Sequence, residues 1–106
     1  MTERYGWKAK VLPGMHAEYR KRHDELWPEM AEVLRRAGIR NYSIWLTGNE
    51  LFGYYECELG AEHAARVQRE SPVVARWDAY MKDVMVMEMD PVTGAQPLMT
   101  QVFYLA

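Results

Sequence analysis

The stretch NYSIWLTGNELFGYYECEL, residues 41–59, reads as two strands joined by a tight turn. Residues 41–46 and 51–59 are rich in the β-branched and aromatic residues that favour strands. The intervening Thr47-Gly48-Asn49 holds residue types that short hairpin turns prefer. Residues 51–59 show little alternation between apolar and polar side chains, which is typical of a strand buried on both faces. We therefore expect an antiparallel hairpin with apolar side chains on both faces.

The chain before this hairpin predicts a strand and then a broken helix. Residues 4–12 alternate with a period of two, so one face of that strand should be buried, with Tyr5, Trp7, Ala9 and Val11 on it. Residues 15–37 follow a helical period, and Gly38 is a natural stop. Pro28 lies inside this helix and cannot donate a backbone hydrogen bond, so the helix should kink, or break and restart, just after Trp27.

The chain after the hairpin predicts two helices, a loop and a closing strand. Residues 60–69 form a short amphipathic pattern, and Ser71-Pro72 is a good start for a helix that runs to about residue 85. Residues 90–94 read as a loop, and residues 99–105 as the last strand. The order β-α-β-β-α-β is that of a ferredoxin-like α+β fold, with one antiparallel sheet and its helices on one face. We expect residues 1–106 to form a single domain.

The second face of such a sheet needs a cover. A second copy of the chain is the simplest cover, which predicts a homodimer with a dimeric α+β barrel architecture. A monomer with an internal ligand pocket on that face would fit as well.

Composition excludes several classes of partner. The formal net charge of −2 over 106 residues provides no basic surplus for nucleic acid. No window is apolar enough to cross a bilayer, and the N-terminus has no stretch of signal-peptide length. Cys57 is the only cysteine, which favours a reducing compartment and predicts a cytoplasmic protein.

The most promising chemistry in the chain lies on the helix before Pro28. Tyr19, His23 and Trp27 are spaced by four residues each, so a helix places them in one row. A histidine titrates near neutral pH and can both give and take a proton. The alternative is an ordinary helical histidine satisfied by water or a backbone carbonyl. The charged residues at 20–22, with those at 24 and 25, read as a solvated face without a special role.

Other chemistries are poorly supported by the residues. His16 and His63 form no metal-ligand spacing with His23, so no metal site is expected. Cys57 is flanked by Glu56 and Glu58, which disfavour its thiolate. The sequence contains neither a phosphate-binding loop nor a dinucleotide fingerprint. The remaining possibilities are acid–base chemistry without a cofactor, or no catalysis.

Several stretches together resemble one family, the L-rhamnose mutarotases. They are EYRKRHDELWPE (18–29), NYSI (41–44), RW (76–77) with YM (80–81), and QVFYL (101–105). The resemblance covers nearly the whole chain in order. It implies a dimeric ferredoxin-like α+β domain, cytoplasmic and free of cofactors, that interconverts the α and β anomers of L-rhamnose. It further implies that His23 is the catalytic acid/base, that Tyr19 and Tyr42 contact the sugar, and that Trp77 forms part of the binding wall.

The resemblance is imperfect at one site position. Members of the family often carry two consecutive tryptophans where this chain has Trp77-Asp78. Asp78 offers a carboxylate to sugar hydroxyls in place of stacking area, so a related deoxysugar such as L-fucose is an alternative substrate. Two other functions also stay open: a cofactor-free monooxygenase or isomerase on the same architecture, and a non-catalytic sugar-binding module.

Overall fold

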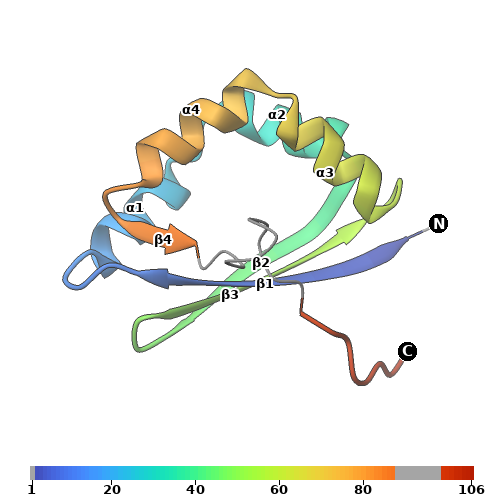
Figure 1. The fold of residues 1–106 in the computed structure, drawn as a ribbon, viewed down its shortest axis with the longest axis horizontal. Coiled ribbons are helices and arrows are strands. Elements are labelled where there is room, and N and C mark those ends of the chain that lie inside the picture. Colours follow the sequence, from blue (N-terminus) through green and yellow to red (C-terminus); the bar gives the residue numbers. More distant parts are fainter. Residues whose placement is uncertain (1, 88–98) are drawn as a thin grey trace, which may run out of the picture.

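The structure is a computed structural model that describes residues 2–87 and 99–106. Four strands and four helices are found in these residues (Figure 1). In chain order they are β1 (Glu3–Val11), α1 (His16–Asp24), α2 (Pro28–Arg36), β2 (Ile39–Thr47), β3 (Glu50–Cys57), α3 (Ala61–Arg69), α4 (Pro72–Met81) and β4 (Met85–Met87).

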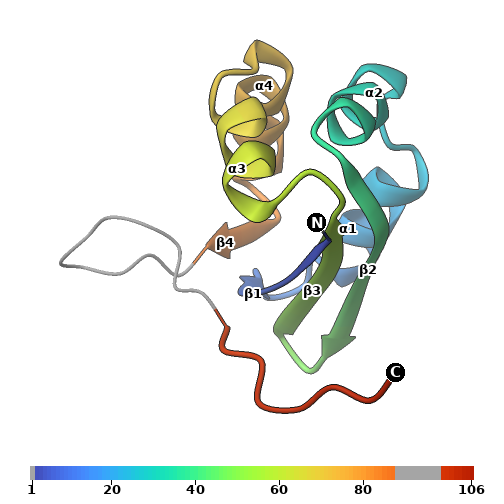
Figure 2. The same cartoon turned by 90° about the vertical axis from the view of Figure 1, so that its right-hand side faces the viewer.

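The strands form one antiparallel sheet in the order β2-β3-β1-β4. The hairpin predicted from residues 41–59 is therefore β2–β3, and β1 pairs along the other edge of β3. The helices arch over one face of this sheet, as two perpendicular views show (Figures 1 and 2). The predicted ferredoxin-like α+β fold is confirmed.

The core lies between the helices and the inner face of the sheet. The inward positions of β1 are buried at Trp7, Ala9 and Val11, as the period-two pattern predicts. β3 contributes Leu51 and the lone thiol of Cys57, both fully buried. Burial of this apolar surface is the main source of stability in a domain of this size.

The expectation that β3 is buried on both faces is wrong for a single chain. Burial alternates strictly along β3, and Phe52 and Tyr54 on the outer face are only half-buried. Trp45, paired with Phe52 on the neighbouring strand, is 69% exposed. The outer face thus carries aromatic side chains that the described chain does not cover.

The helical region breaks where Pro28 predicts. α1 ends at Asp24, and Trp27 is extended at φ −60° and ψ 134°, after which Pro28 opens α2. A proline at the first helical position loses no intrahelical bond, whereas one inside a continuous helix would. The break lets α1 and α2 face different neighbours.

The closing strand was predicted at the wrong place. Residues 99–106 form no regular structure, and the fourth strand is β4, whose first residue, Met85, is where the predicted helix was expected to end. That helix, α4, ends at Met81 instead of residue 85. The Met99 N–H donates one bond to the Gly6 carbonyl of β1 at 3.4 Å, and the chain then runs on the side of the sheet opposite the helices (Figure 2). The predicted loop at 90–94 lies outside the described residues.

Candidate active site

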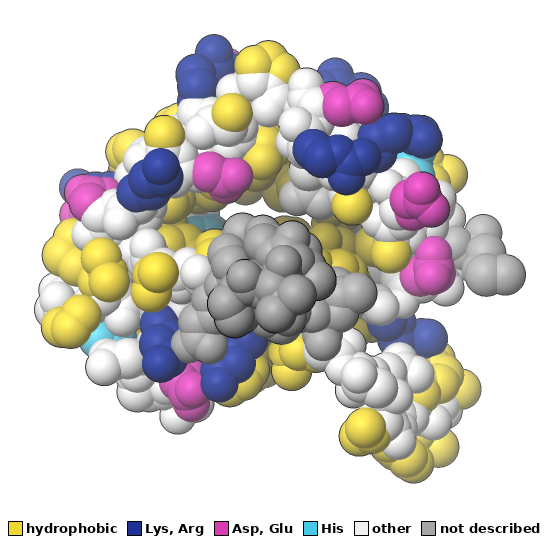
Figure 3. Space-filling view, in the orientation of Figure 1, with side chains coloured by type: hydrophobic (Ala, Val, Ile, Leu, Met, Phe, Trp, Pro, Cys, Tyr) yellow, Lys and Arg dark blue, Asp and Glu magenta, His cyan; other side chains and the backbone are white. Residues whose placement is uncertain are grey.

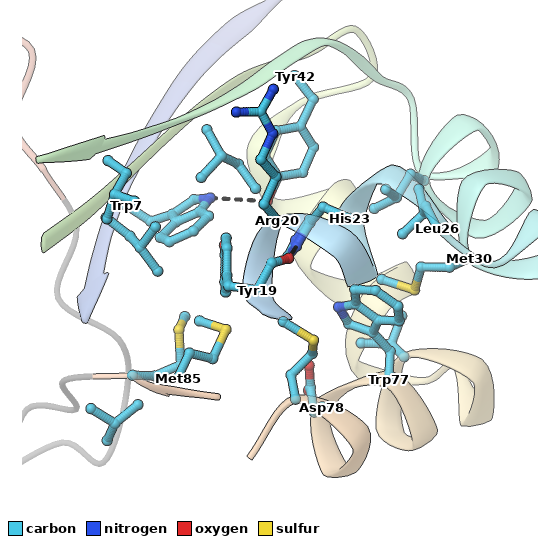
Figure 4. A pocket seen from close by; sticks show the side chains of 18 of the residues that line it. Trp7, Tyr19, Arg20, His23, Leu26, Met30, Tyr42, Trp77, Asp78 and Met85 are labelled. Carbon is cyan, nitrogen blue, oxygen red and sulfur yellow. Dashed lines mark hydrogen bonds between the residues drawn. The ribbon is translucent and has the colours of Figure 1, made fainter. Parts of the chain in front are cut away.

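A single cavity brings together all five residues singled out from the sequence. It has a volume of about 1330 Å³ and lies between the helices and the inner face of the sheet. Hydrophobic side chains gather around this hollow, while charged side chains lie mainly on the outer rim (Figure 3). Its lining includes Tyr19, His23, Tyr42, Trp77 and Asp78 (Figure 4).

His23 lies on the last turn of α1, with one ring nitrogen already engaged. Its Nδ1 lies 3.1 Å from the backbone carbonyl oxygen of Tyr19, one turn earlier. Because a carbonyl oxygen only accepts hydrogen bonds, Nδ1 carries the hydrogen, and Nε2 of the neutral ring has a free lone pair. Burial lowers the pKa of His23 below its ordinary 6.5, and the contact with the Tyr19 carbonyl and the charge of Asp24 only partly offset this. At neutral pH the side chain is therefore an uncharged base.

Tyr19 supplies a hydroxyl that no described residue engages. The side chain is 6% exposed, and its ring packs on His23 with the ring centroids 4.4 Å apart. Among the described residues its hydroxyl oxygen is buried without a hydrogen-bond partner. Such an orphaned group is costly unless a ligand or water satisfies it. The hydroxyl thus marks a position in the cavity where a polar group belongs.

Tyr42 reaches the cavity from β2 because the strand bulges at this point. Arg40 pairs with Glu56 and Ser43 with Tyr54, so Asn41 and Tyr42 together occupy the space of one residue. Asn41 adopts the left-handed conformation, with φ 51°. A bulge of this kind re-aims the neighbouring side chain and is common next to active sites. The Tyr42 hydroxyl is enclosed enough that burial raises its pKa.

Trp77 forms the aromatic wall. It is buried on α4 and packs perpendicular to His23, with the ring centroids 5.5 Å apart and the planes at 90°. Trp27 also packs perpendicular to this indole, with the ring centroids 5.1 Å apart. The predicted row of three on one helix is therefore only partly formed: Tyr19 and His23 share α1, while Trp27 lies past its end and joins the group through Trp77.

Asp78 follows Trp77 and stands at the edge of the cavity. Burial raises the pKa of its carboxyl, and the positive charge of Lys82, one turn later on α4, lowers it. The carboxylate thus lies near the aromatic wall with an oxygen pair available as hydrogen-bond acceptors.

Arg22 holds the site together in a way that the sequence did not indicate. Its guanidinium donates to both oxygens of Asp83 at 2.8 and 3.3 Å, to the Tyr80 carbonyl at 2.6 Å and to Glu18 at 2.7 Å. Its side chain is only 11% exposed. The expectation of a solvated face is wrong here, because Arg22 ties α1 to the end of α4. Tyr80 and Asp83 lie 58 and 61 residues from Arg22 in the chain, so no local spacing in the sequence could have predicted these two contacts.

Residues 2–87 and 99–106 lack two further classes of feature. No group of three or more histidine, cysteine, aspartate or glutamate side chains could hold a metal ion there. None of the described helices is both long and apolar enough to cross a membrane.

The fold and the site define a class: a ferredoxin-like α+β protein whose cavity holds His23 among tyrosine and tryptophan side chains. A family model described as L-rhamnose mutarotase matches residues 4–105. A curated relative named L-rhamnose mutarotase, from Jannaschia sp. (strain CCS1), is 40% identical, and the match covers 97% of this chain and 98% of the relative. Another of the same name, from Mesorhizobium japonicum, is 42% identical, and the match covers the full length of both chains. A crystal structure of the L-rhamnose mutarotase from Formosa agariphila superposes with a TM-score of 0.78, at 29% identity over 98% of this chain and 99% of that one. This chain belongs to the L-rhamnose mutarotase family.

Proposed function

We propose that this chain interconverts the α and β anomers of L-rhamnose, with His23 as the single acid/base group. The observation that carries the mechanism is the Nδ1 contact with the Tyr19 carbonyl, which leaves Nε2 as a base in the cavity. Family membership supports the reaction and the substrate.

One imidazole can carry out the whole proton transfer. Nε2 removes the proton from the anomeric hydroxyl, the bond between C1 and the ring oxygen breaks, and the imidazolium returns the proton to the ring oxygen. The product is the open aldehyde, with one proton moved between two oxygens that share C1. Rotation about the C1–C2 bond and the reverse steps close the ring on the other carbonyl face. The lowered pKa favours the neutral ring in which this cycle begins.

The other site residues have distinct roles in this proposal. The orphaned Tyr19 hydroxyl and the Tyr42 hydroxyl bind sugar oxygens. Trp77 packs against the C–H face of the ring while holding His23 in place. Asp78 accepts a hydrogen bond from a sugar hydroxyl at the edge of the cavity. These side chains present both apolar and polar contacts, as small-molecule sites do.

Asp78 is the position at which we expect sugar preference to be set. An acidic acceptor and an indole ring make different demands on the substrate, so L-rhamnose and L-fucose should respond differently to Asp78→Trp. A larger change in exchange for one sugar than for the other supports this role. An equal effect on both sugars contradicts it.

Saturation transfer between the two anomeric proton signals of L-rhamnose tests the function directly. We expect exchange with the wild-type protein and a loss of about 10²–10⁴-fold in His23→Ala, the usual contribution of one general acid/base. His63→Ala is the matched control, since His63 lies on α3 beside Arg66 and is absent from the cavity lining. Exchange that survives in His23→Ala would remove this residue from the mechanism.

We further propose that the chain forms a homodimer through the outer face of the sheet, giving a dimeric α+β barrel. Trp45 at 69% exposure lies on this face beside Phe52. On the same side, Phe103 and Leu105 of the C-terminal segment are 76% and 80% exposed. An exposed apolar surface of this extent favours association. Sedimentation should give twice the chain mass for the wild type and a shift toward monomer for Trp45→Glu.

Residues 1–106 are proposed to act as one mutarotase-like domain in the cytoplasm. The compartment is supported by Cys57, which is a free and buried thiol. Fractionation of the source cells tests it.

A further inference from the structure

Trp7 is a cavity residue that the proposed mechanism leaves unused. It lies on the inner face of β1, is 6% exposed, and lines the cavity (Figure 4). Its indole Nε1 lies 3.1 Å from the hydroxyl oxygen of Tyr42. Because the sheet order is β2-β3-β1, this bond passes over the whole width of β3.

A glycine on β3 makes that crossing possible. Gly53 is the register partner of Trp7, and a Cβ atom built on Gly53 would lie 1.9 Å from Cε2 of the indole. The indole therefore lies against the bare backbone of β3, where any side chain at position 53 would displace it. A glycine within a strand often marks such a close approach.

The Tyr42 side of the bond is fixed as well. The Asn41 amide, in the bulge next to Tyr42, donates to a carboxylate oxygen of Glu56 at 2.9 Å. Glu56 also accepts from the Tyr54 hydroxyl at 2.8 Å, which anchors the carboxylate on the outer face. The Tyr42 ring packs against Tyr55, with the centroids 4.9 Å apart. Both ends of the Trp7–Tyr42 bond thus rest on the sheet.

The bond determines the direction of the Tyr42 hydroxyl. An indole N–H is a donor only, so the Tyr42 oxygen must be the acceptor in this contact. Its own hydrogen then points elsewhere, and no acceptor for it is found among the described residues. We propose that Trp7 is a positioning residue that commits the Tyr42 hydroxyl to donate a hydrogen bond to an oxygen of the bound sugar. This inference rests on the proposed function of the cavity.

The two tyrosines of the site consequently differ in kind. The Tyr19 hydroxyl has no described partner and can turn to give or accept a hydrogen bond. The Tyr42 oxygen already accepts from Trp7, so the hydroxyl has its hydrogen left to give. A fixed donor discriminates against a ligand that lacks the matching acceptor, because the ligand then displaces water from the hydroxyl without replacing its hydrogen bond.

A double-mutant cycle tests whether Trp7 acts through Tyr42. Exchange of L-rhamnose is measured at a range of sugar concentrations for wild type, Trp7→Phe, Tyr42→Phe and the double variant. We expect Trp7→Phe to lower kcat/KM by about 3- to 10-fold, the range for one neutral hydrogen bond. In the Tyr42→Phe background the same substitution should cost nothing further, because the hydroxyl it orients is gone.

The control is the same substitution at Trp45. This indole donates to the Ser43 hydroxyl at 3.0 Å, is 69% exposed and does not line the cavity, so Trp45→Phe removes a comparable bond on the outer face of the sheet. It should leave kcat/KM within twofold of wild type. Where Phe at position 7 leaves a void that lowers the melting temperature, Trp7→benzothienylalanine keeps the fused ring and removes only the N–H.

The possible outcomes separate the two proposals. Losses that multiply in the double variant would show that Trp7 acts independently of Tyr42, and the inference would be overturned while mutarotation stands. An unchanged kcat/KM in Trp7→benzothienylalanine would overturn it as well. If the wild-type protein exchanges no sugar, the proposed function fails, and the inference fails with it.

Discussion

The two helices on either side of Pro28 are of equal length but are held in place by different forces. α2 packs through apolar side chains, burying Met30 and Val33. α1, which carries Tyr19 and His23, buries only Tyr19 and has no continuous apolar stripe. It is tied instead by Arg22 to α4 and by His16, whose Nε2 lies 2.9 Å from the Gly48 carbonyl in the hairpin turn. Apolar burial stabilises α2 but is not directional. The hydrogen bonds of α1 have preferred angles and therefore fix the orientation of the helix that carries the site.

Among the variants that test this difference between α1 and α2, Arg22→Met should have the largest effect. Arg22→Met keeps much of the side chain's length but loses the bonds to Asp83, Tyr80 and Glu18. We expect L-rhamnose exchange to fall about 10²-fold, because a displacement near 1 Å of the reacting group has a cost of this order. Kinetics of anomer exchange, with circular dichroism to confirm the fold, check this. Full activity in a folded Arg22→Met variant would show that the orientation of α1 does not depend on the hydrogen bonds of Arg22.

A substitution that leaves a void under α2 should lower the stability of the fold without changing the rate of anomer exchange. Val33→Ala removes two methyl groups from a side chain that is 2% exposed and is absent from the cavity lining. The free energy of unfolding should fall by about 2–3 kcal/mol. Urea denaturation measures this, and the exchange rate per folded molecule should stay at the wild-type value. A slower exchange would mean that α2 also orients the site.

The pH dependence should show α1 acting through the charge state of His23. Protonation removes the base, so exchange should decrease as the pH falls through the pKa of His23, which lies below 6.5. The folded state binds this proton more weakly than the unfolded chain does, so stability also falls as the pH drops below 6.5. Asp24 raises this pKa, and Asp24→Asn should therefore move the acid limb to lower pH. Titration of the His23 ring protons by NMR provides the check, and a limb that moves to higher pH contradicts it.

An exposed ion pair on α2 should have the smallest effect. Arg35 lies 3.9 Å from Glu32, with both side chains about two-thirds exposed. Arg35→Met should change the free energy of unfolding by less than about 0.5 kcal/mol and leave exchange unchanged. It is the matched control for Arg22→Met, because the same substitution is made in a helix of the same length. A comparable loss in both variants would erase the distinction between the helices.

The features that local chemistry controls could be predicted from the sequence. Pro28 breaks the helix because it lacks an N–H, and the period-two pattern places Trp7, Ala9 and Val11 in the core. The spacing of Tyr19 and His23 brings their rings together because they lie one turn apart on α1. These inferences need no knowledge of distant partners.

What the sequence missed depends on contacts between distant residues. Trp7 reads as a core residue, and its bond to Tyr42 exists only because Gly53 leaves room on the strand between them. Residues 99–105 have strand-like composition, but a strand needs a ladder of hydrogen bonds to a partner. β4 pairs with β1 at Ala9, Lys10 and Val11, and the one backbone bond from the described residues 99–106 to β1 runs from the Met99 N–H to the Gly6 carbonyl.

The thiol of Cys57 makes opening of the sheet measurable by chemical modification. It is fully buried on β3, with Glu3 of β1 on one side and Ile39 of β2 on the other. Burial also raises the pKa of this thiol, so an alkylating reagent meets a reactive sulfur only when the strands separate. The rate of alkylation therefore depends on how often the sheet opens. Arg22→Met should leave that rate nearly unchanged. Val33→Ala should raise it exponentially with the lost free energy of unfolding, about tenfold for each 1.4 kcal/mol.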